Sequence, residues 1–186
     1  MKNLLLIITV FLAVQSFGQI SYGAKVGVNM SKIKDVHGDS NQGFGFMAGG
    51  FVSIPLQDYS QEFFIQPELL FSQLGEKDGS ESVKLNYIQI PVLFKAYFSE
   101  QDTEFFGEIG PQLGFMLGQN LPKNYRYNHE FNTFDYGVTA GVGFSYLRTW
   151  EINMRFYYGF ADVLDKDVRD ARNFNSYFSG GLAYRF

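Results

Sequence analysis

Charged residues recur inside otherwise apolar, alternating stretches of this chain, and they are the side chains best placed to do chemistry. They lie about four to seven residues from the same end of their stretches and share one face by alternation: Lys25, Glu68, Lys95, Glu108 and Arg155. Because three of these stretches are consecutive, we expect Lys95 to lie between Glu68 and Glu108. The set predicts a buried network of ion pairs; the alternative is a path for protons or ions.

Histidines and aspartates offer a weaker case for a catalytic or metal site. His37 and His129 both lie in polar segments, and a set of His37, Asp39 and Ser40 would have no fixed triad geometry within one loop. A second acidic segment has basic residues interleaved and lacks EF-hand spacing: Asp162, Asp165, Asp167 and Asp170. The chain has no cysteine, which removes thiolate chemistry. We therefore expect no catalytic residue, no cofactor and no metal.

The N-terminus has the pattern of a secretory signal peptide. A basic start is followed by an apolar run, Leu4–Val14, and then by small residues at the spacing of a cleavage site. The run is shorter than the about 20 residues that a membrane-spanning helix needs. We expect cleavage near Gly18 and Gln19, so the predicted organisation is a signal peptide at 1–18 and one domain at 19–186.

The rest of the chain alternates between apolar and polar residues, which is the period of a β-strand. The alternation predicts eight strands: Ser21–Ser31, Gly43–Ile54, Glu62–Gln73, Val83–Ser99, Phe105–Gly118, Asp135–Leu147, Trp150–Phe160 and Asn175–Phe186. Connections after every odd strand are long and polar, including 75–82, whereas the others are short. The predicted fold is therefore all-β, an up-and-down antiparallel meander.

The two faces of these strands decide between a barrel in a membrane and a soluble barrel of the lipocalin kind. The polar face of the sixth strand carries small residues, such as Gly137, Gly141 and Ser145, which suit a crowded lumen better than a solvated surface. The opposite faces are large and apolar, with aromatic residues near strand ends that fit the two girdles of a membrane barrel: Tyr136, Tyr146, Trp150, Tyr158 and Tyr184. We therefore predict an eight-stranded transmembrane β-barrel.

Irregular positions are expected within three of the strands. The alternation slips near Asn86 and Tyr87, which predicts a β-bulge. Pro67, Pro91 and Pro111 fall in successive strands, and proline cannot donate to a ladder. Bulges or missing hydrogen bonds are therefore predicted at the prolines.

The end of the chain resembles the C-terminal insertion signal of bacterial outer-membrane β-barrels. The stretch Ser179–Phe186 follows its pattern of glycine, hydrophobic residue and terminal aromatic, carried here by Gly181, Leu182, Tyr184 and Phe186. We expect Leu182, Tyr184 and Phe186 to face lipid and Arg185 to face inward. Arg185 should then lie within reach of Glu151.

The whole chain after the signal resembles the small outer-membrane β-barrel family of Bacteroidota, which includes PorT-like and porin-like proteins. The resemblance rests on the opening at 23–31, the block Tyr-Ile-Gln-Ile-Pro-Val-Leu-Phe-Lys at 87–95, the spacing of Gly110, Gly114 and Gly118, and the terminal strand. It implies an outer-membrane location, contact with outer-membrane lipid and insertion by the barrel assembly machinery. PorT-type members are linked to secretion, which suggests envelope or secretion proteins as further partners.

Function is predicted less sharply than fold. The first hypothesis is a non-enzymatic, monomeric barrel with a side-chain-packed lumen that presents extracellular loops. An accessory component of a secretion or assembly machine, a narrow solute or ion channel, and a lipid-modifying enzyme are the alternatives. The formal net charge of -4 argues against a nucleic-acid partner.

Overall fold

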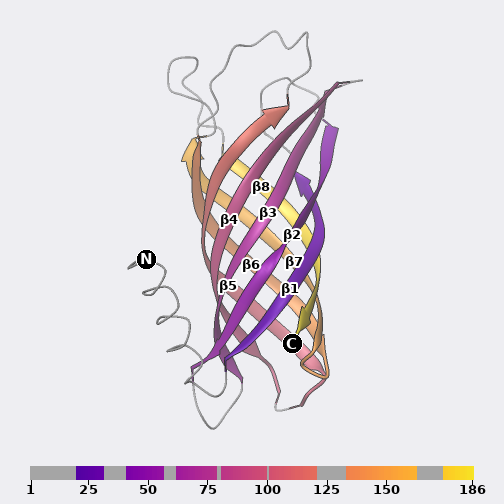
Figure 1. The fold of residues 1–186 in the computed structure, drawn as a ribbon, viewed down its shortest axis with the longest axis vertical. Coiled ribbons are helices and arrows are strands. Elements are labelled where there is room, and N and C mark those ends of the chain that lie inside the picture. Colours follow the sequence, from indigo (N-terminus) through magenta and orange to yellow (C-terminus); the bar gives the residue numbers. More distant parts are fainter. Residues whose placement is uncertain are drawn as a thin grey trace, which may run out of the picture.

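The chain folds into eight strands that form one closed sheet (Figure 1). The computed structural model describes residues 20–31, 41–56, 62–78, 81–99, 101–120, 133–162 and 174–186. In chain order the strands are β1 (Ser21–Ser31), β2 (Asn41–Pro55), β3 (Phe63–Asp78), β4 (Glu81–Tyr97), β5 (Glu104–Asn120), β6 (Phe134–Tyr146), β7 (Trp150–Asp162) and β8 (Phe174–Arg185). Within these residues, no helix has the length and apolar character needed to cross a membrane.

The sheet closes because its first strand pairs with its last. Every strand runs antiparallel to its neighbours in the sequence, and β1 pairs with both β2 and β8. The closing register extends from Gly23 opposite Arg185 to Ser31 opposite Tyr177. Closure pairs the backbone groups that a free edge would leave exposed, which hydrocarbon does not tolerate. The predicted eight-stranded antiparallel meander is confirmed.

Side chains alternate between the lumen and the outer surface. On β6, Thr139 and Ser145 are 1% and 0% exposed, whereas Val142 between them is 63% exposed. An outer surface made of such apolar residues suits lipid hydrocarbon and is ill suited to water. On β7 the outward apolar residues run from Trp150 to Phe160. That span is about 33 Å along the strand, or about 25 Å in height once the strand tilts, as in a membrane barrel.

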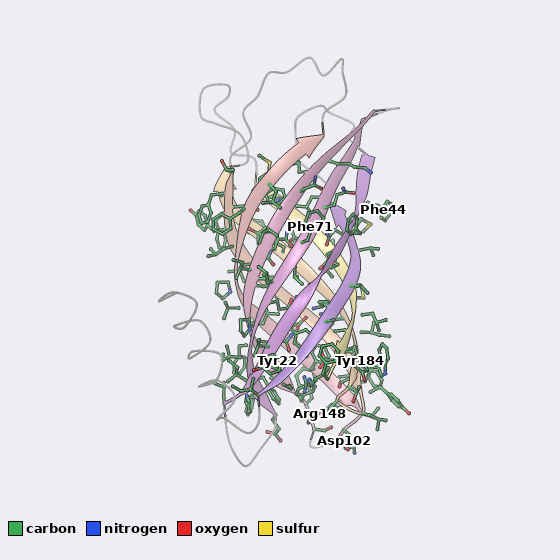
Figure 2. The ribbon with its side chains drawn as sticks, viewed as in Figure 1. Tyr22, Phe44, Phe71, Asp102, Arg148 and Tyr184 are labelled. Carbon is green, nitrogen blue, oxygen red and sulfur yellow. The ribbon has the colours of Figure 1, made fainter. Side chains whose placement is uncertain are left out.

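Aromatic residues gather at both ends of this apolar band. Trp150 and Tyr184 lie at the end where the chain terminates, and Tyr136 and Phe160 lie at the other end. Figure 2 shows Tyr184 and Tyr22 near the lower end of the barrel, beside the turns that carry Arg148 and Asp102. These positions match the two interfacial girdles expected of a membrane barrel.

One predicted loop is wrong. The segment 75–82 was expected to connect the third and fourth strands, but β3 continues to Asp78 and β4 begins at Glu81. Pairing between them extends to Asp78 opposite Glu81. Charged residues at a strand end are acceptable where the strand has left the hydrocarbon, so charge alone did not mark the end of pairing.

The predicted irregularities are partly confirmed. The register between β4 and β5 shifts between Asn86 and Tyr87, as expected of the bulge. At the prolines, bulges or missing hydrogen bonds were predicted, and the structure shows the second without the first: pairing of each proline with the preceding strand is interrupted, yet the register is the same on both sides of each gap. The gaps fall at Pro67 between β2 and β3, at Pro91 between β3 and β4, and at Pro111 between β4 and β5. Each proline therefore removes ladder pairing without adding a residue.

Several predicted features lie outside the described residues. These are the signal peptide at 1–18 with its cleavage near Gly18 and Gln19, both histidines, and most of the second acidic segment: His37, His129, Asp165, Asp167 and Asp170.

Candidate functional site: the charge network of the lumen

The five charged residues of the predicted network all lie inside the barrel: Lys25, Glu68, Lys95, Glu108 and Arg155. Their exposed fractions range from 0% for Lys95 to 5% for Glu108 and Arg155. They come from β1, β3, β4, β5 and β7, so the network spans the lumen from wall to wall. Charges this deeply buried require partners, because an isolated ion would lose its hydration without compensation.

Arg155 is the centre of the network. Its guanidinium donates to both oxygens of Glu68, at 2.6 and 2.8 Å, and to both oxygens of Glu108, at 2.5 and 3.0 Å. Two bidentate pairs use the planar fork of arginine on two edges at once, a geometry that lysine cannot reproduce. The backbone of β6 makes room at Gly141, where an added Cβ would lie 2.8 Å from Cγ of Arg155.

Further polar groups complete the coordination of the two carboxylates. Lys25 pairs with Glu68 at 3.4 Å, and the Gln66 amide donates to the same carboxylate at 2.7 Å. The Asn153 amide donates to Glu108 at 2.9 Å. Lys25 and Arg155 thus balance Glu68 and Glu108 in charge, which makes this half of the network neutral.

Lys95 does not lie between Glu68 and Glu108 as expected. Its backbone is opposite Glu108 in the register, but its ammonium crosses the lumen to Glu151 on β7, at 2.5 Å. It also donates to the Gln66 amide oxygen at 3.4 Å and lies 3.9 Å from the centre of the Phe106 ring. Arg155 already bonds all four oxygens of Glu68 and Glu108, and Lys95 instead pairs with a carboxylate on the far side of the barrel.

Glu151 gathers a second set of donors near the turn end of the barrel. Arg185 pairs with it at 2.9 Å, as the sequence predicted, and the Tyr97 hydroxyl donates to it at 2.7 Å. Arg185 also donates to the Tyr97 hydroxyl oxygen at 2.7 Å. This half of the network holds two cations, Lys95 and Arg185, around one carboxylate.

Three uncharged residues of the network were not predicted, although the alternation of their strands indicates that they face the lumen. Gln66, Tyr97 and Asn153 each lie two positions from a predicted network residue on the same strand. They therefore face the lumen by the same period-two rule that selected the charges.

Aromatic residues close the lumen on the side away from the chain terminus. Leu74, Leu85, Tyr87, Tyr157 and Tyr177 form one buried cluster there. The Tyr177 hydroxyl accepts hydrogen bonds from the Gln89 and Gln112 amides at 2.8 and 2.6 Å.

The turn end is closed by a second cluster and by an arginine from the β6–β7 turn. Phe64, Tyr97 and Phe106 form the cluster, and the Arg148 guanidinium lies 4.1 Å from the centre of the Tyr97 ring and pairs with Glu104. Leu147 and Arg148 both have positive φ, at 53° and 51°, a strained conformation for non-glycine residues. The Arg148 amide donates to the carbonyl of Asp102 at 2.8 Å, which ties this turn to the β4–β5 turn.

The residues of the predicted insertion signal divide between the two surfaces. Gly181 faces the lumen, where an added Cβ would lie 2.7 Å from the Asn153 amide oxygen. Leu182, Tyr184 and Phe186 face outward and are 42%, 37% and 77% exposed. The amide of Phe186 donates to the carbonyl of Tyr22 at 2.8 Å, so the closing pairing continues to the last residue.

The closed antiparallel barrel agrees with comparison to known proteins. The sequence profile described as "Outer membrane protein beta-barrel domain" matches residues 14–165. The chain belongs to the outer-membrane protein β-barrel domain family. It is accordingly an outer-membrane protein that crosses the bilayer with its strands. No curated protein sequence matches the chain.

Several solved structures of outer-membrane barrels have the same fold as this chain at low sequence identity. Neisserial surface protein A (NspA) aligns with a TM-score of 0.55 and 12% identity, covering 90% of this chain and 97% of that one. The outer membrane protein OprG from Pseudomonas aeruginosa aligns with a TM-score of 0.52 and 12% identity, covering 89% of this chain and 95% of that one. The outer membrane enzyme PagL aligns with a TM-score of 0.51 and 10% identity, covering 86% of this chain and 98% of that one. These likenesses concern the fold alone, and a fold shared with an enzyme does not decide catalysis.

Within the part of the chain that the structure describes, no group of three or more His, Cys, Asp or Glu side chains could hold a metal ion. The described acidic lumen residues are instead engaged by cations and amides, as the contacts of Glu68, Glu108 and Glu151 illustrate.

Proposed function

We propose that this outer-membrane barrel is a non-conducting, non-enzymatic scaffold that presents its extracellular segments for interaction with other molecules. The observation that supports the proposal is the pair of bidentate contacts from Arg155 to Glu68 and Glu108, which join three strands through the middle of the lumen. An eight-stranded barrel has space for little more than its own side chains, and this one fills that space with mutually bonded charges.

Three layers of side chains support a closed lumen. The aromatic cluster around Tyr157 and Tyr177 lies above the charges, on the side away from the short turns. The cluster around Phe106 with Arg148 lies below them, at the turn end. An ion entering this lumen would have to displace paired, desolvated groups, each of which costs several kcal/mol to expose unpaired. The proposed scaffold therefore acts through its ends and not through its interior.

Conductance separates the scaffold from the narrow channel. Purified barrel is incorporated into planar bilayers, and we expect no discrete current steps above those of protein-free bilayers. A matched variant, Arg155→Ala together with Glu68→Ala and Glu108→Ala, removes the charges in the middle of the lumen but leaves both aromatic clusters, so it should also give no current steps. Discrete steps from the unaltered protein that this variant enlarges would overturn the non-conducting scaffold.

Partner capture tests the presenting role. Intact protein in detergent serves as bait, beside a variant in which residues 121–132 are replaced by a Gly-Ser segment of equal length. We expect a specific envelope or extracellular partner to bind the unaltered protein and to lose binding in the variant. Capture of secretion or assembly components that is unaffected by the replacement would instead favour the accessory role. Heat-dependent gel migration confirms that both proteins are folded barrels.

A further inference from the structure

A shallow apolar groove lies on the outer surface of the barrel where the first strand meets the last. Its outward-facing lining comes from β1, β7 and β8: Ala24, Val26, Trp150, Leu182 and Tyr184. Ala24 forms its low point, because Ala24 pairs with the larger Tyr184 on one side and with Gly50 on the other. The groove therefore results from small residues beside a ridge of aromatic ones.

The aromatic ridge has a defined geometry. The rings of Trp150 and Tyr184 meet edge to face at 4.7 Å between centroids, and Phe186 continues the row at 5.5 Å from Tyr184. Trp150 directly follows the β6–β7 turn, and Tyr184 lies next to the chain end. These residues belong to the girdle at the turn end, which in such barrels lies at the periplasmic interface.

The seam beneath the groove has little side-chain interlocking. Gly27 lies opposite Gly181 on the lumen side, and Val28 lies opposite Gly180 on the outer side. This seam also joins the two ends of the domain, so its pairing carries the longest loop closure in the fold. Apolar contact across the groove would add cohesion next to these glycine positions of the closing seam.

We propose that the groove binds one acyl chain of a phospholipid from the periplasmic leaflet and that this lipid stabilises the β1–β8 closure. The lining is apolar and lies within the hydrocarbon band, so it is continuous with the lipid-facing surface already described. Five side chains offer far less than the roughly 800 Å² per partner of a stable protein interface, which favours a chain-like occupant. A ligand that binds only the closed barrel stabilises it by mass action. The proposed lipid site is independent of the scaffold function.

Trp150 makes the test direct, because it is the only tryptophan of the chain and lines the groove. Barrel in detergent micelles is titrated with a phospholipid that carries bromine on its acyl chains, a short-range quencher of tryptophan fluorescence. We expect quenching to saturate near one lipid per barrel and urea unfolding to shift to higher concentration as lipid is added.

Two substitutions of equal size separate a site from general lipid contact. Ala24→Phe fills the groove and should weaken the saturable quenching about tenfold, the loss of contact with roughly two methylene groups. Ala140→Phe adds the same bulk to the outer face of β6 and should leave quenching unchanged. Ala24→Leu serves as the smaller filling change if Ala24→Phe does not fold by heat-dependent gel migration.

The remaining outcomes decide against the site. Quenching that rises in proportion to lipid without saturating, and equally in the groove-filled and control variants, means that no lipid site exists there. Preferential displacement by lipopolysaccharide would assign the groove to the other leaflet's lipid. A mass in light scattering that doubles in the unaltered protein and not in Ala24→Phe would assign it to a second copy of the chain.

Discussion

The two halves of the lumen network bind their charges in opposite ways. In one half a single cation, Arg155, donates hydrogen bonds to all four carboxylate oxygens of Glu68 and Glu108, while Lys25 adds one longer contact to Glu68. In the other half, Glu151 alone serves Lys95, Arg185 and the Tyr97 hydroxyl. The first arrangement concentrates the network on one cation, and the second distributes donors around one anion. Loss of a single cation should therefore have very different consequences in the two halves.

The largest effect is expected from Arg155→Met. The substitution leaves two buried carboxylates with only Lys25 and amides as partners. Breaking a buried pair from one side typically costs about 3–5 kcal/mol, and here two pairs break together. We expect the free energy of unfolding, measured by urea titration in lipid vesicles, to fall by at least that amount or the barrel not to assemble.

A compensated variant shows whether the cost comes from uncompensated charge. Combining Arg155→Met with Glu68→Gln, Glu108→Gln and Lys25→Met removes both the carboxylates that the first change leaves unpaired and the buried lysine that pairs with Glu68. We expect this variant to recover a substantial part of the lost stability, because replacing a whole buried ion cluster is far less costly than breaking it. Equal instability of the single and the compensated variant would show that Arg155 acts through packing instead.

An intermediate effect is expected from Lys95→Met. Glu151 keeps Arg185 and Tyr97 as donors after the change, so its charge is not stranded. The lost charged hydrogen bond should lower the unfolding free energy by about 1.5–3 kcal/mol. Conductance in planar bilayers should be unchanged, since the aromatic clusters above and below remain. A destabilisation as large as that of Arg155→Met would remove the distinction between the two halves.

The sequence was sufficient to predict which residues share the lumen and insufficient to predict which of them pair. Period-two alternation sent Glu68, Lys95 and Arg155 inward because a strand fixes the side of every residue. Pairing depends on how far long side chains cross a narrow lumen, and proximity along the sheet does not determine that distance. Lys95 therefore bonds Glu151 on a distant strand although Glu108 is its sheet neighbour.

The strand ends and prolines show a similar limit. The register shift does fall at Asn86 and Tyr87, but the extra residue is Leu117 on β5. The alternation of β4 itself continues, since Leu85, Tyr87 and Gln89 all face the lumen. The apparent slip in the sequence arose because apolar side chains line the lumen there. An interrupted pairing at Pro67 leaves the alternation intact, so sequence cannot distinguish it from a bulge compensated elsewhere. The extension of β3 to Asp78 was missed because charge marks the edge of hydrocarbon and not the end of a hydrogen-bonded strand.

The smallest effect on stability within the network is expected from Arg185→Gln. The Arg185 side chain is 10% exposed at the turn end, and Lys95 still neutralises Glu151 after the change. A glutamine can keep a hydrogen bond to the carboxylate, so we expect a loss of about 1 kcal/mol or less. Deleting the adjacent Phe186 removes an outward aromatic residue that is 77% exposed. If the terminal aromatic is an insertion signal, this deletion should reduce the fraction of heat-modifiable barrel in membranes far more than Arg185→Gln does. Equal assembly of the two variants would show that the terminal aromatic is not an insertion signal, and also that the hydrogen bond from the Phe186 amide to Tyr22 is not needed to close the sheet.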